Sequence, residues 1–420
     1  MSEKIKHRID VYRIVTKFFF KWLVIALLVG AVVGAVGSAF AILLTHISEF
    51  RAHNHYLTYL LPLGIVIVFL YKLLKYDDKG TNIVISNVQE KGEVSFKVAP
   101  LMFISTAITQ LFGGSSGREG AALQIGGGIA SGIGKLFKMD VHDKHMIVMC
   151  GMSAGFSSVF GTPLAAAFFA IEVATVGHFS HAPLVPCVVS SITAWVISIF
   201  LHTEREVFTV TSFSEVTVLN LFKIAVIAAL CAIMAVVFCI LLSKGGALIK
   251  KTFKNPYIRI LACSGLLILI YELEGSDMFS GAGNHLIFEA LKGNAKIYSP
   301  LLKMIVTVIT LKGGFKGGEI VPSFAIGATF GCLMGQLFGL SPSMCAAICM
   351  VAFFSAATNC PITALVLGFE LFGFEGAVFF ALAIVIAVYA SGFYSLYSSQ
   401  LVALSAYEID EKEEKIHTVH

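Results

Sequence analysis

The sequence is poor in charged residues for its length. Only 13% of its 420 residues are Asp, Glu, Lys or Arg, whereas 57% are hydrophobic and the mean hydropathy is +0.85. A water-soluble protein of this size needs far more charge to cover its surface. The shortage therefore excludes a soluble globular protein and indicates a chain that lies in a membrane.

The chain also lacks the signatures of several other protein classes. Its nine cysteines include no CxxC pair and lie mostly in apolar runs, as small buried side chains do. No His-Glu-x-x-His motif is present, and the net charge of +4 is not gathered on one basic face. We therefore expect no nucleic-acid partner.

Long uncharged runs supply the membrane spans. Residues 22–44 and 224–243 carry no formal charge over 23 and 20 residues, and 320–369 carries none over 50 residues. A helix needs about 20 apolar residues to cross the hydrocarbon core. The first two runs therefore predict one span each, and the third, which is broken by prolines, predicts several short helices. Six basic residues precede the first run and place the N-terminus in the cytoplasm: Lys4, Lys6, Arg8, Arg13, Lys17 and Lys21.

The two halves of the chain repeat one plan. Glu119, in the sequence Gly-Arg-Glu-Gly, follows Pro100 by 19 positions, and Glu319, in Gly-Gly-Glu-Ile, follows Pro300 by 19 positions. Apolar segments broken by Gly or Pro at matching places in two halves indicate a transporter with its site at the repeat interface. We predict an amphipathic N-terminal helix, a first transmembrane repeat, a connector, a second transmembrane repeat and a charged cytoplasmic tail, over 1–21, 22–201, 202–218, 219–405 and 406–420.

A second pair of acids also repeats. Glu172 follows Pro163 by nine positions, and Glu370 follows Pro361 by nine positions. Acids at such places could carry protons, but we favour helix-end carboxylates that are held by hydrogen bonds.

Four Gly-rich breaks predict helix N-termini inside the membrane, at 80–83, 117–121, 281–285 and 317–321. Irregular backbone at that depth is tolerated only when it is buried in protein or lines a polar cavity, so the breaks should converge. Their free N–H groups could form an anion site without any full positive charge. Such a site suits a small, hard anion in transit, because dipoles bind it and release it.

Two intramembrane acids are the candidates for gating and proton transfer. The Glu119 carboxylate could occupy the anion site and leave it on protonation, although it could instead cap a helix start. Arg118 is either its neutralising partner or an interfacial anchor. Glu319 could relay protons on the inner side, or it could be a helix-terminal carboxylate that pairs with Lys312 or Lys316.

At these motifs the chain resembles the CLC family of chloride channels and anion/proton antiporters over about residues 10–400. Glu119 matches the family's gating glutamate, and Tyr397 matches its anion-coordinating tyrosine. The resemblance implies an all-α membrane protein, a CLC-like inverted-repeat bundle of many unequal, broken helices. It also implies a homodimer with one pathway per subunit, no cofactor and no metal. By the same analogy the dimer contacts lie in 164–174, 186–201, 361–373 and 376–396.

The resemblance also supplies the expected anion-binding residues. Gly80-Thr81-Asn82 corresponds loosely to the family's serine loop, with Thr81 in place of the serine, and 318–322 corresponds to its Gly-Ile-Phe-Ala-Pro loop. Phe288 could present its positive ring edge to the anion, or it could simply pack. The full set is Gly80, Thr81, Asn82, Gly117, Arg118, Gly120, Ala121, Ile320, Val321, Tyr397 and Phe288.

Departures from the family pattern point to one branch. Glu319 stands where the family usually has an apolar residue, and Val173 stands where chloride/proton exchangers usually carry a second internal acid. These features resemble the fluoride/proton antiporter branch. We therefore expect a secondary active transporter, not an enzyme, that exports fluoride from the cytoplasm in exchange for protons. Its partners would be fluoride, protons and the lipid bilayer of a prokaryotic plasma (inner) membrane.

Other functions stay open on the sequence alone. A chloride/proton exchanger or a passive anion channel could use the same scaffold. A remote alternative is an intramembrane serine hydrolase, because Ser115 lies in a Gly-x-Ser-Gly pattern and Ser153 in Gly-x-Ser-x-Gly. Such an enzyme would need a base histidine on a facing helix.

Overall fold

The computed structural model describes residues 3–76, 80–89, 92–204 and 206–403, so the predicted tail 406–420 lies outside the described residues. The first half contains helices of unequal length and one very short strand. They are α1 (Glu3–His53), η1 (His55–Gly64), α2 (Ile65–Leu73), α3 (Asn82–Val88), α4 (Val98–Leu111), α5 (Glu119–Leu136), α6 (Val141–Phe160), α7 (Pro163–Glu172), β1 (Thr175–Val176) and α8 (Leu184–Phe200).

The second half follows after an irregular connector. Its elements are α9 (Val218–Ile240), η2 (Leu241–Gly245), α10 (Gly246–Thr252), α11 (Pro256–Glu274), α12 (Asn284–Leu291), α13 (Ser299–Gly313), α14 (Ile320–Phe338), α15 (Pro342–Thr358), α16 (Pro361–Phe372), α17 (Ala377–Ser391) and β2 (Leu401–Val402). The two strands pair in parallel over two residues each and are the β-structure of the described chain. The molecule is therefore all-α, as predicted.

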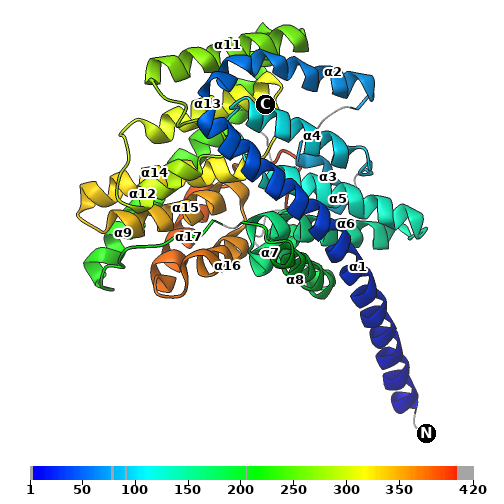
Figure 1. Cartoon of the computed structure of the whole chain (residues 1–420). Helices are drawn as coiled ribbons and strands as arrows, with labels where there is room; N and C mark the ends of the chain where they lie inside the picture. Colours follow the sequence, from blue (N-terminus) through cyan, green and yellow to red (C-terminus); the bar gives the residue numbers. More distant parts are fainter. Residues whose placement is uncertain (1–2, 77–79, 90–91, 205, 404–420) are drawn as a thin grey trace.

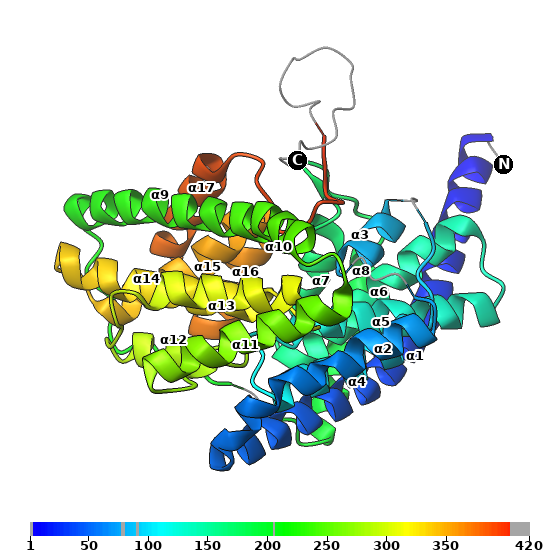
Figure 2. The same cartoon turned by 90° about the horizontal axis from the view of Figure 1, so that it is seen from above.

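The helices of each half gather on one side of the molecule. Helices α3 to α8 lie on one side and α9, α12 and α14 to α17 on the other, and α1 runs along the first group with its N-terminal turns extending away (Figures 1 and 2). The N-terminal segment that the sequence predicts as a separate helix is continuous with the first span in α1. No Gly or Pro interrupts the chain near residue 21, so the helix propagates through that boundary.

The same pattern of helix contacts occurs within each half. Helix α5 packs on α6 and α6 on α7 in the first half, just as α14 packs on α15 and α15 on α16 in the second. Close approach depends on small residues at both crossings. A Cβ atom on Gly126 would strike the Gly151 carbonyl, and one on Gly331 would strike the Cys345 carbonyl. Small residues allow such backbone contact where lipid supplies no hydrophobic drive between helices.

Many helices are too short to cross a bilayer. Within the described residues, five helical stretches are long and apolar enough to span by length and composition: Tyr12–His53, His55–Leu73, Val218–Thr252, Pro256–Glu274 and Ile320–Phe338. Six further apolar helices have 10 to 17 residues. Helices this short end within the membrane, so their ends must be buried in protein or line a polar cavity. The Gly-rich sequence predicts such broken helices.

Two carboxylates, one buried and one partly buried, tie the halves together. Glu172, at the end of α7, accepts hydrogen bonds from the N–H groups of Ile362 (3.0 Å) and Thr363 (2.8 Å) at the start of α16. Glu370, near the end of α16, accepts them from the N–H groups of Leu164 (2.9 Å) and Ala165 (2.8 Å) at the start of α7. Each carboxylate therefore caps the other helix, which favours the structural interpretation of this pair.

Removal of one cap should destabilise the protein. Glu172→Ala removes the acceptor from the N–H of Ile362 and from the N–H and hydroxyl of buried Thr363, which costs roughly 1–3 kcal/mol. We expect a lower free energy of unfolding of the purified protein in detergent, measured by thermal or chemical denaturation. Glu375→Ala, at an exposed site in the turn after α16, is the control and should leave the stability unchanged. Equal stability of the two variants would contradict the capping role.

Candidate functional site

The Gly-rich breaks before α5 and α14 meet face to face. The N–H of Gly117 donates to the carbonyl oxygen of Gly318 at 2.6 Å, and the N–H of Gly318 donates to that of Gly117 at 2.7 Å. A Cβ atom on Gly120 would lie 2.8 Å from Cα of Gly318, so a side chain there would push the two backbones apart. This pair of hydrogen bonds, the Gly117–Gly318 bridge, sets the start of α5 beside the start of α14.

Glu119 lies buried at the first position of α5, with 1% of its surface exposed. Its Oε2 accepts a hydrogen bond of 3.1 Å from the N–H of Arg118, and its Oε1 lies 3.5 Å from Nε of Arg118. The carboxylate therefore occupies a helix N-terminus, which is the kind of place where a free anion binds.

Arg118 connects Glu119 to a third charged residue. Its Nη2 lies 3.4 Å from Oε1 of Glu206, which belongs to the connector between α8 and α9, and the same oxygen accepts a hydrogen bond from the amide of Asn284 at the start of α12. Removal of the Glu206 carboxyl from solvent raises its pKa above the ordinary value, and Arg118 and Asn284 act in the opposite direction. No periodic pattern or motif marks Glu206 in the sequence, because it lies in an irregular polar segment.

Glu319 lies on the other side of the Gly117–Gly318 bridge. It is partly buried, directly precedes α14, and its Oε1 accepts a hydrogen bond of 3.3 Å from Oγ1 of Thr81 at the start of α3. The positive charge of Lys312 attracts the negative charge of the Glu319 carboxylate. The hydroxyl of Tyr397 lies near the same carboxylate without a hydrogen bond of standard geometry, and it is buried. Glu319 thus meets two hydroxyl groups and a basic side chain.

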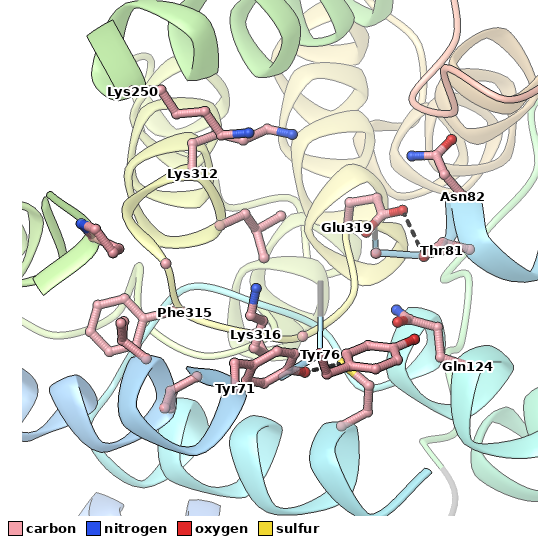
Figure 3. Close-up of a pocket in the computed structure, with 18 of the residues that line it drawn as sticks. Tyr71, Tyr76, Thr81, Asn82, Gln124, Lys250, Lys312, Phe315, Lys316 and Glu319 are labelled. Atoms are coloured by element: carbon pink, nitrogen blue, oxygen red, sulfur yellow. Dashed lines mark hydrogen bonds between the residues drawn. The ribbon is translucent and has the colours of Figure 1, made fainter. Parts of the chain in front are cut away.

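A basic cavity opens beside Glu319. It has a volume of about 970 Å³, and Gly80, Thr81, Asn82 and Gln124 line it together with Glu319. Figure 3 shows Lys250, Lys312 and Lys316 on the opposite wall from Thr81 and Asn82. The basic lining residues are Lys72, Lys75, Lys250, Arg259, Lys312 and Lys316. Glu319 is the one carboxylate among the described lining residues. This cavity, the vestibule, therefore attracts anions.

Most of the remaining predicted residues lie near the Gly117–Gly318 bridge or the vestibule, and Phe288 does not. Ala121, Ile320 and Val321 are buried in the first turns of α5 and α14, and Asn82 uses its Oδ1 to accept a bond of 2.9 Å from the N–H of Ser399. Phe288 does not line the vestibule. Its ring centroid lies 5.2 Å from that of Phe208, an aromatic contact on α12.

The four predicted helix N-termini do not form one cluster. The breaks at 117–121 and 317–321 meet at the Gly117–Gly318 bridge, and the break at 80–83 joins them through Thr81 and Glu319. The fourth, at 281–285, is joined to the others through intermediate side chains: Asn284 contacts Glu206, which pairs with Arg118 beside Glu119, and Lys303 bonds both Gly281 and Ser115. A full positive charge also lies at these breaks, because Arg118 lies against Glu119, and the predicted anion site itself stays a prediction. An intramembrane carboxylate that accepts few hydrogen bonds is stabilised by a nearby cation.

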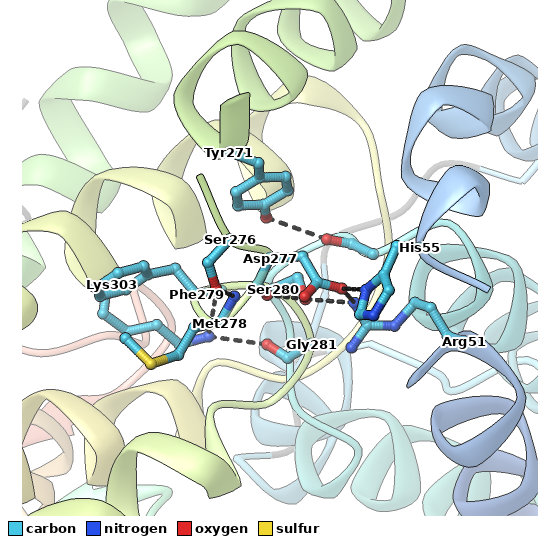
Figure 4. A network of polar contacts seen from close by, with 11 residues as sticks. Arg51, His55, Tyr271, Ser276, Asp277, Met278, Phe279, Ser280, Gly281 and Lys303 are labelled. Carbon is cyan, nitrogen blue, oxygen red and sulfur yellow. Dashed lines mark hydrogen bonds and ion pairs between the residues drawn. The ribbon is translucent and has the colours of Figure 1, made fainter. Parts of the chain in front are cut away.

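Lys303 on α13 fixes two of the breaks, and the sequence analysis missed it. Its Nζ is fully buried and donates to Oγ of Ser115 (2.9 Å) and to the carbonyl oxygens of Phe279 (3.0 Å) and Gly281 (2.8 Å). Figure 4 shows this network beside the ion pair of Arg51 with Asp277. A lone lysine in the apolar run that follows Pro300 was the available signal, since such a residue needs buried acceptors.

The same contacts argue against a serine hydrolase. Ser115 is buried and has Lys303 rather than histidine as its basic neighbour, and Nζ of Lys303 is also bonded to the carbonyl oxygens of Phe279 and Gly281. Ser153 donates to the carbonyl oxygens of Cys150 and Cys187, both at 3.0 Å, deep in the helix packing. Neither serine lines the vestibule.

These features define a membrane transport protein with paired broken helices and an acid at each break. Comparison with known proteins agrees. The family described as voltage gated chloride channel matches residues 63–392, and the chain belongs to this family, CLC. A curated relative, the chloride/fluoride channel protein of Pseudomonas syringae pv. tomato, is 34% identical over 94% of this chain and 89% of its own length.

Solved structures give the same result. The crystal structure of a CLC-type fluoride/proton antiporter aligns with a TM-score of 0.88 and 32% identity, over 92% of this chain and 98% of its own. A slow cyanobacterial Cl−/H+ antiporter aligns with a TM-score of 0.75 at 19% identity, over 88% and 94% of the two chains, which supports the fold. The predicted resemblance to the CLC family and the predicted fold are confirmed.

The close approach at the Gly117–Gly318 bridge can be tested by one added methyl group. Gly120→Ala places a carbon atom against backbone that cannot rotate away, and such overpacking costs about 1–3 kcal/mol. We expect an equal loss in the free energy of unfolding, measured in detergent. Gly265→Ala on α11 is the matched control, because its added Cβ would meet no atom within 4 Å. A Gly120→Ala protein as stable as the Gly265→Ala protein would show that the bridge tolerates separation.

Proposed function

We propose that this protein exports fluoride across a membrane in exchange for protons. The proposal is carried by one observation: a carboxylate lies at a helix N-terminus on each side of the Gly117–Gly318 bridge, that of Glu119 buried and that of Glu319 partly exposed to the vestibule. A carboxylate at such a place competes with a transported anion and binds a proton instead when the anion takes its place. The names of the relatives favour fluoride as that anion, since one is a chloride/fluoride channel protein and another a fluoride/proton antiporter.

Glu119 would act as the gate. In the described conformation its carboxylate accepts the N–H of Arg118 and so fills a place suited to an anion. Protonation would remove its charge and weaken that contact, and the place would become free. The anion and the proton are then linked through the states of one residue, which is the requirement for exchange.

Glu319 would carry the proton between Glu119 and the vestibule. Val173 is buried and cannot bind a proton. The position that holds an internal acid in chloride/proton exchangers therefore has no proton-carrying group in this chain. Glu319 lies beside the vestibule and beside the hydroxyl groups of Thr81 and Tyr397. A proton and an anion could therefore meet at the same hydroxyl groups.

Fluoride suits these donors. It is small, strongly hydrated and a strong acceptor, so its water shell must be replaced by short hydrogen bonds. The Tyr397 hydroxyl is buried without a hydrogen-bond partner of standard geometry, and Thr81 donates to a carboxylate that an anion could replace. We propose that Gly80, Thr81, Asn82 and Tyr397 form the inner part of the anion path.

Orientation follows from charge. Basic residues before residue 22 favour a cytoplasmic N-terminus, and we propose that the basic vestibule also faces the cytoplasm. Its cations would raise the local fluoride concentration at Glu319. The membrane would be a prokaryotic plasma (inner) membrane, in keeping with a relative from Pseudomonas.

We further propose a homodimer through the outer faces of α7, α8, α16 and α17. Large apolar side chains are exposed on these four helices, among them Leu164, Val196, Phe200, Ile362 and Val385. A partner with the same surface would cover them, and the mutual caps at Glu172 and Glu370 hold two of the helices in one unit.

The direct test is ion exchange in proteoliposomes. Vesicles loaded with fluoride should release it to a fluoride electrode, and an outward fluoride gradient should drive protons inward against their gradient. The same vesicles loaded with chloride should give a much smaller flux and little proton movement. Fluoride release without proton uptake would make the protein a passive channel, and equal chloride coupling would make it a chloride/proton exchanger.

Glu319→Gln should abolish fluoride transport or its coupling to protons, because the amide keeps the shape of the side chain but cannot bind and release a proton. The measurement is simultaneous fluoride efflux and internal pH in proteoliposomes. Glu172→Gln, which changes an acid that caps a helix, is the matched control and should retain coupled transport. Fully coupled exchange in Glu319→Gln would refute the proton role.

A further inference from the structure

The vestibule accounts for the inner side of the pathway, whereas the cluster of Glu119, Arg118 and Glu206 is left unexplained. Its members come from the start of α5 and from the connector, and none of them lines the vestibule. Glu119 is sealed from solvent, while 12% of the Arg118 side chain and 24% of the Glu206 side chain are exposed. The cluster therefore leads from a buried acid to solvent on a side away from the vestibule.

The connector is held in place around Glu206. Phe208 is buried and packs on Phe288 of α12 and on Phe372 of α16, with ring centroids 5.2 Å and 6.4 Å apart. The N–H of Thr211 donates to Oγ of Ser343 on α15 at 3.0 Å. Asn284 of α12 donates directly to Glu206. The carboxylate is thus anchored beside Arg118 from three elements, which makes the contact part of the fold.

Few other charged groups face the cluster. Among the described residues, Arg118 and Glu206 are the charged side chains that act on Glu119, and Arg118 is the one that acts on Glu206. On α12, His285 is exposed and acts on Glu289. On α13, Lys303 is bound to Ser115 and to two carbonyl oxygens. Two carboxylates therefore share one guanidinium.

The net charge of the cluster decides how readily Glu119 takes up a proton. With both acids ionised, the cluster has a net charge of −1 in a largely dry environment, and one bound proton makes it neutral. Without the charge of Glu206, the pair of Glu119 and Arg118 is already neutral. A proton on Glu119 would then leave the Arg118 cation uncompensated. The shared guanidinium therefore favours proton uptake only when Glu206 is present.

We propose that Glu206 is a positioning residue that allows Glu119 to take up a proton from the side opposite the vestibule. It holds the Arg118 guanidinium between two carboxylates and so prevents Arg118 from locking Glu119 in its ionised, blocking state. The proton comes from water on that side, and no bond other than the O–H bond of the carboxyl group forms. This inference rests on the proposed fluoride/proton exchange.

The test is the pH profile of Glu206→Gln. The amide keeps the shape and an acceptor for Asn284 but removes the charge, so proton uptake by Glu119 should require more acidic solution. Fluoride efflux is measured in proteoliposomes with the same pH on both sides, over a series from acid to mildly alkaline buffers. We expect the half-maximal rate to move to lower pH by about one unit or more, which is about tenfold in the protonated fraction. Full activity at acid pH would show that the variant is folded.

Three further variants make the result specific. Glu204→Gln, exposed on the same connector, removes an equal charge away from Arg118 and should keep the wild-type profile. Glu206→Asp keeps the charge and should stay close to wild type. Arg118→Gln in the Glu206→Gln background removes the uncompensated cation and should move the profile back toward neutral pH. This rescue would not occur if Glu206 only supported the connector.

The outcomes distinguish a failure of the proposed fluoride/proton exchange from a failure of the role of Glu206. If wild-type vesicles show no fluoride-driven proton uptake, the proposed function itself fails. If the wild type is coupled but Glu206→Gln and Glu204→Gln share its pH profile, the role of Glu206 alone is overturned. A Glu206→Gln protein with low activity at every pH, and no rescue by Arg118→Gln, would equally overturn it in favour of a structural contact.

Discussion

Two reciprocal hydrogen bonds between Gly117 and Gly318 hold the centre of this protein together. At membrane depth every backbone N–H and carbonyl group needs a partner, and the chain breaks two helices there. Pairing the two breaks with each other satisfies both at once, and it leaves the N-termini of α5 and α14 side by side. Only residues without side chains allow this, since a Cβ on Gly120 would strike Gly318. The positions of Glu119 and Glu319 follow from this contact.

The structure uses four acids near helix ends in two different ways. Glu172 and Glu370 accept two or more hydrogen bonds from the helix that they cap, so both oxygen atoms are bound and the side chains are fixed. Glu119 and Glu319 each accept a single hydrogen bond of standard geometry from another residue, and a basic side chain acts on each, Arg118 on Glu119 and Lys312 on Glu319. A carboxylate with few fixed donors can exchange its place with an anion. The number of donors therefore separates the structural acids from the functional pair.

The two functional acids have unequal surroundings despite the repeat. On one side of the Gly117–Gly318 bridge, a single guanidinium lies between Glu119 and Glu206. On the other, Glu319 faces a cavity of about 970 Å³ with many basic side chains. One side thus suits a single buried proton, and the other suits the collection of anions from solution.

The sequence by itself determined the membrane location, the repeat, the positions of the breaks and the two central acids. These depend on local chemistry: the length of uncharged runs, the special backbone freedom of glycine and the cost of an acid among apolar residues. The tertiary structure alone decided that Arg118 is shared with Glu206, that Lys303 binds Ser115 and Gly281, that Phe288 packs on Phe208, and that Glu172 caps α16. Each of these contacts joins residues far apart in the chain, and packing between helices selects such partners. No local pattern in the sequence records that choice.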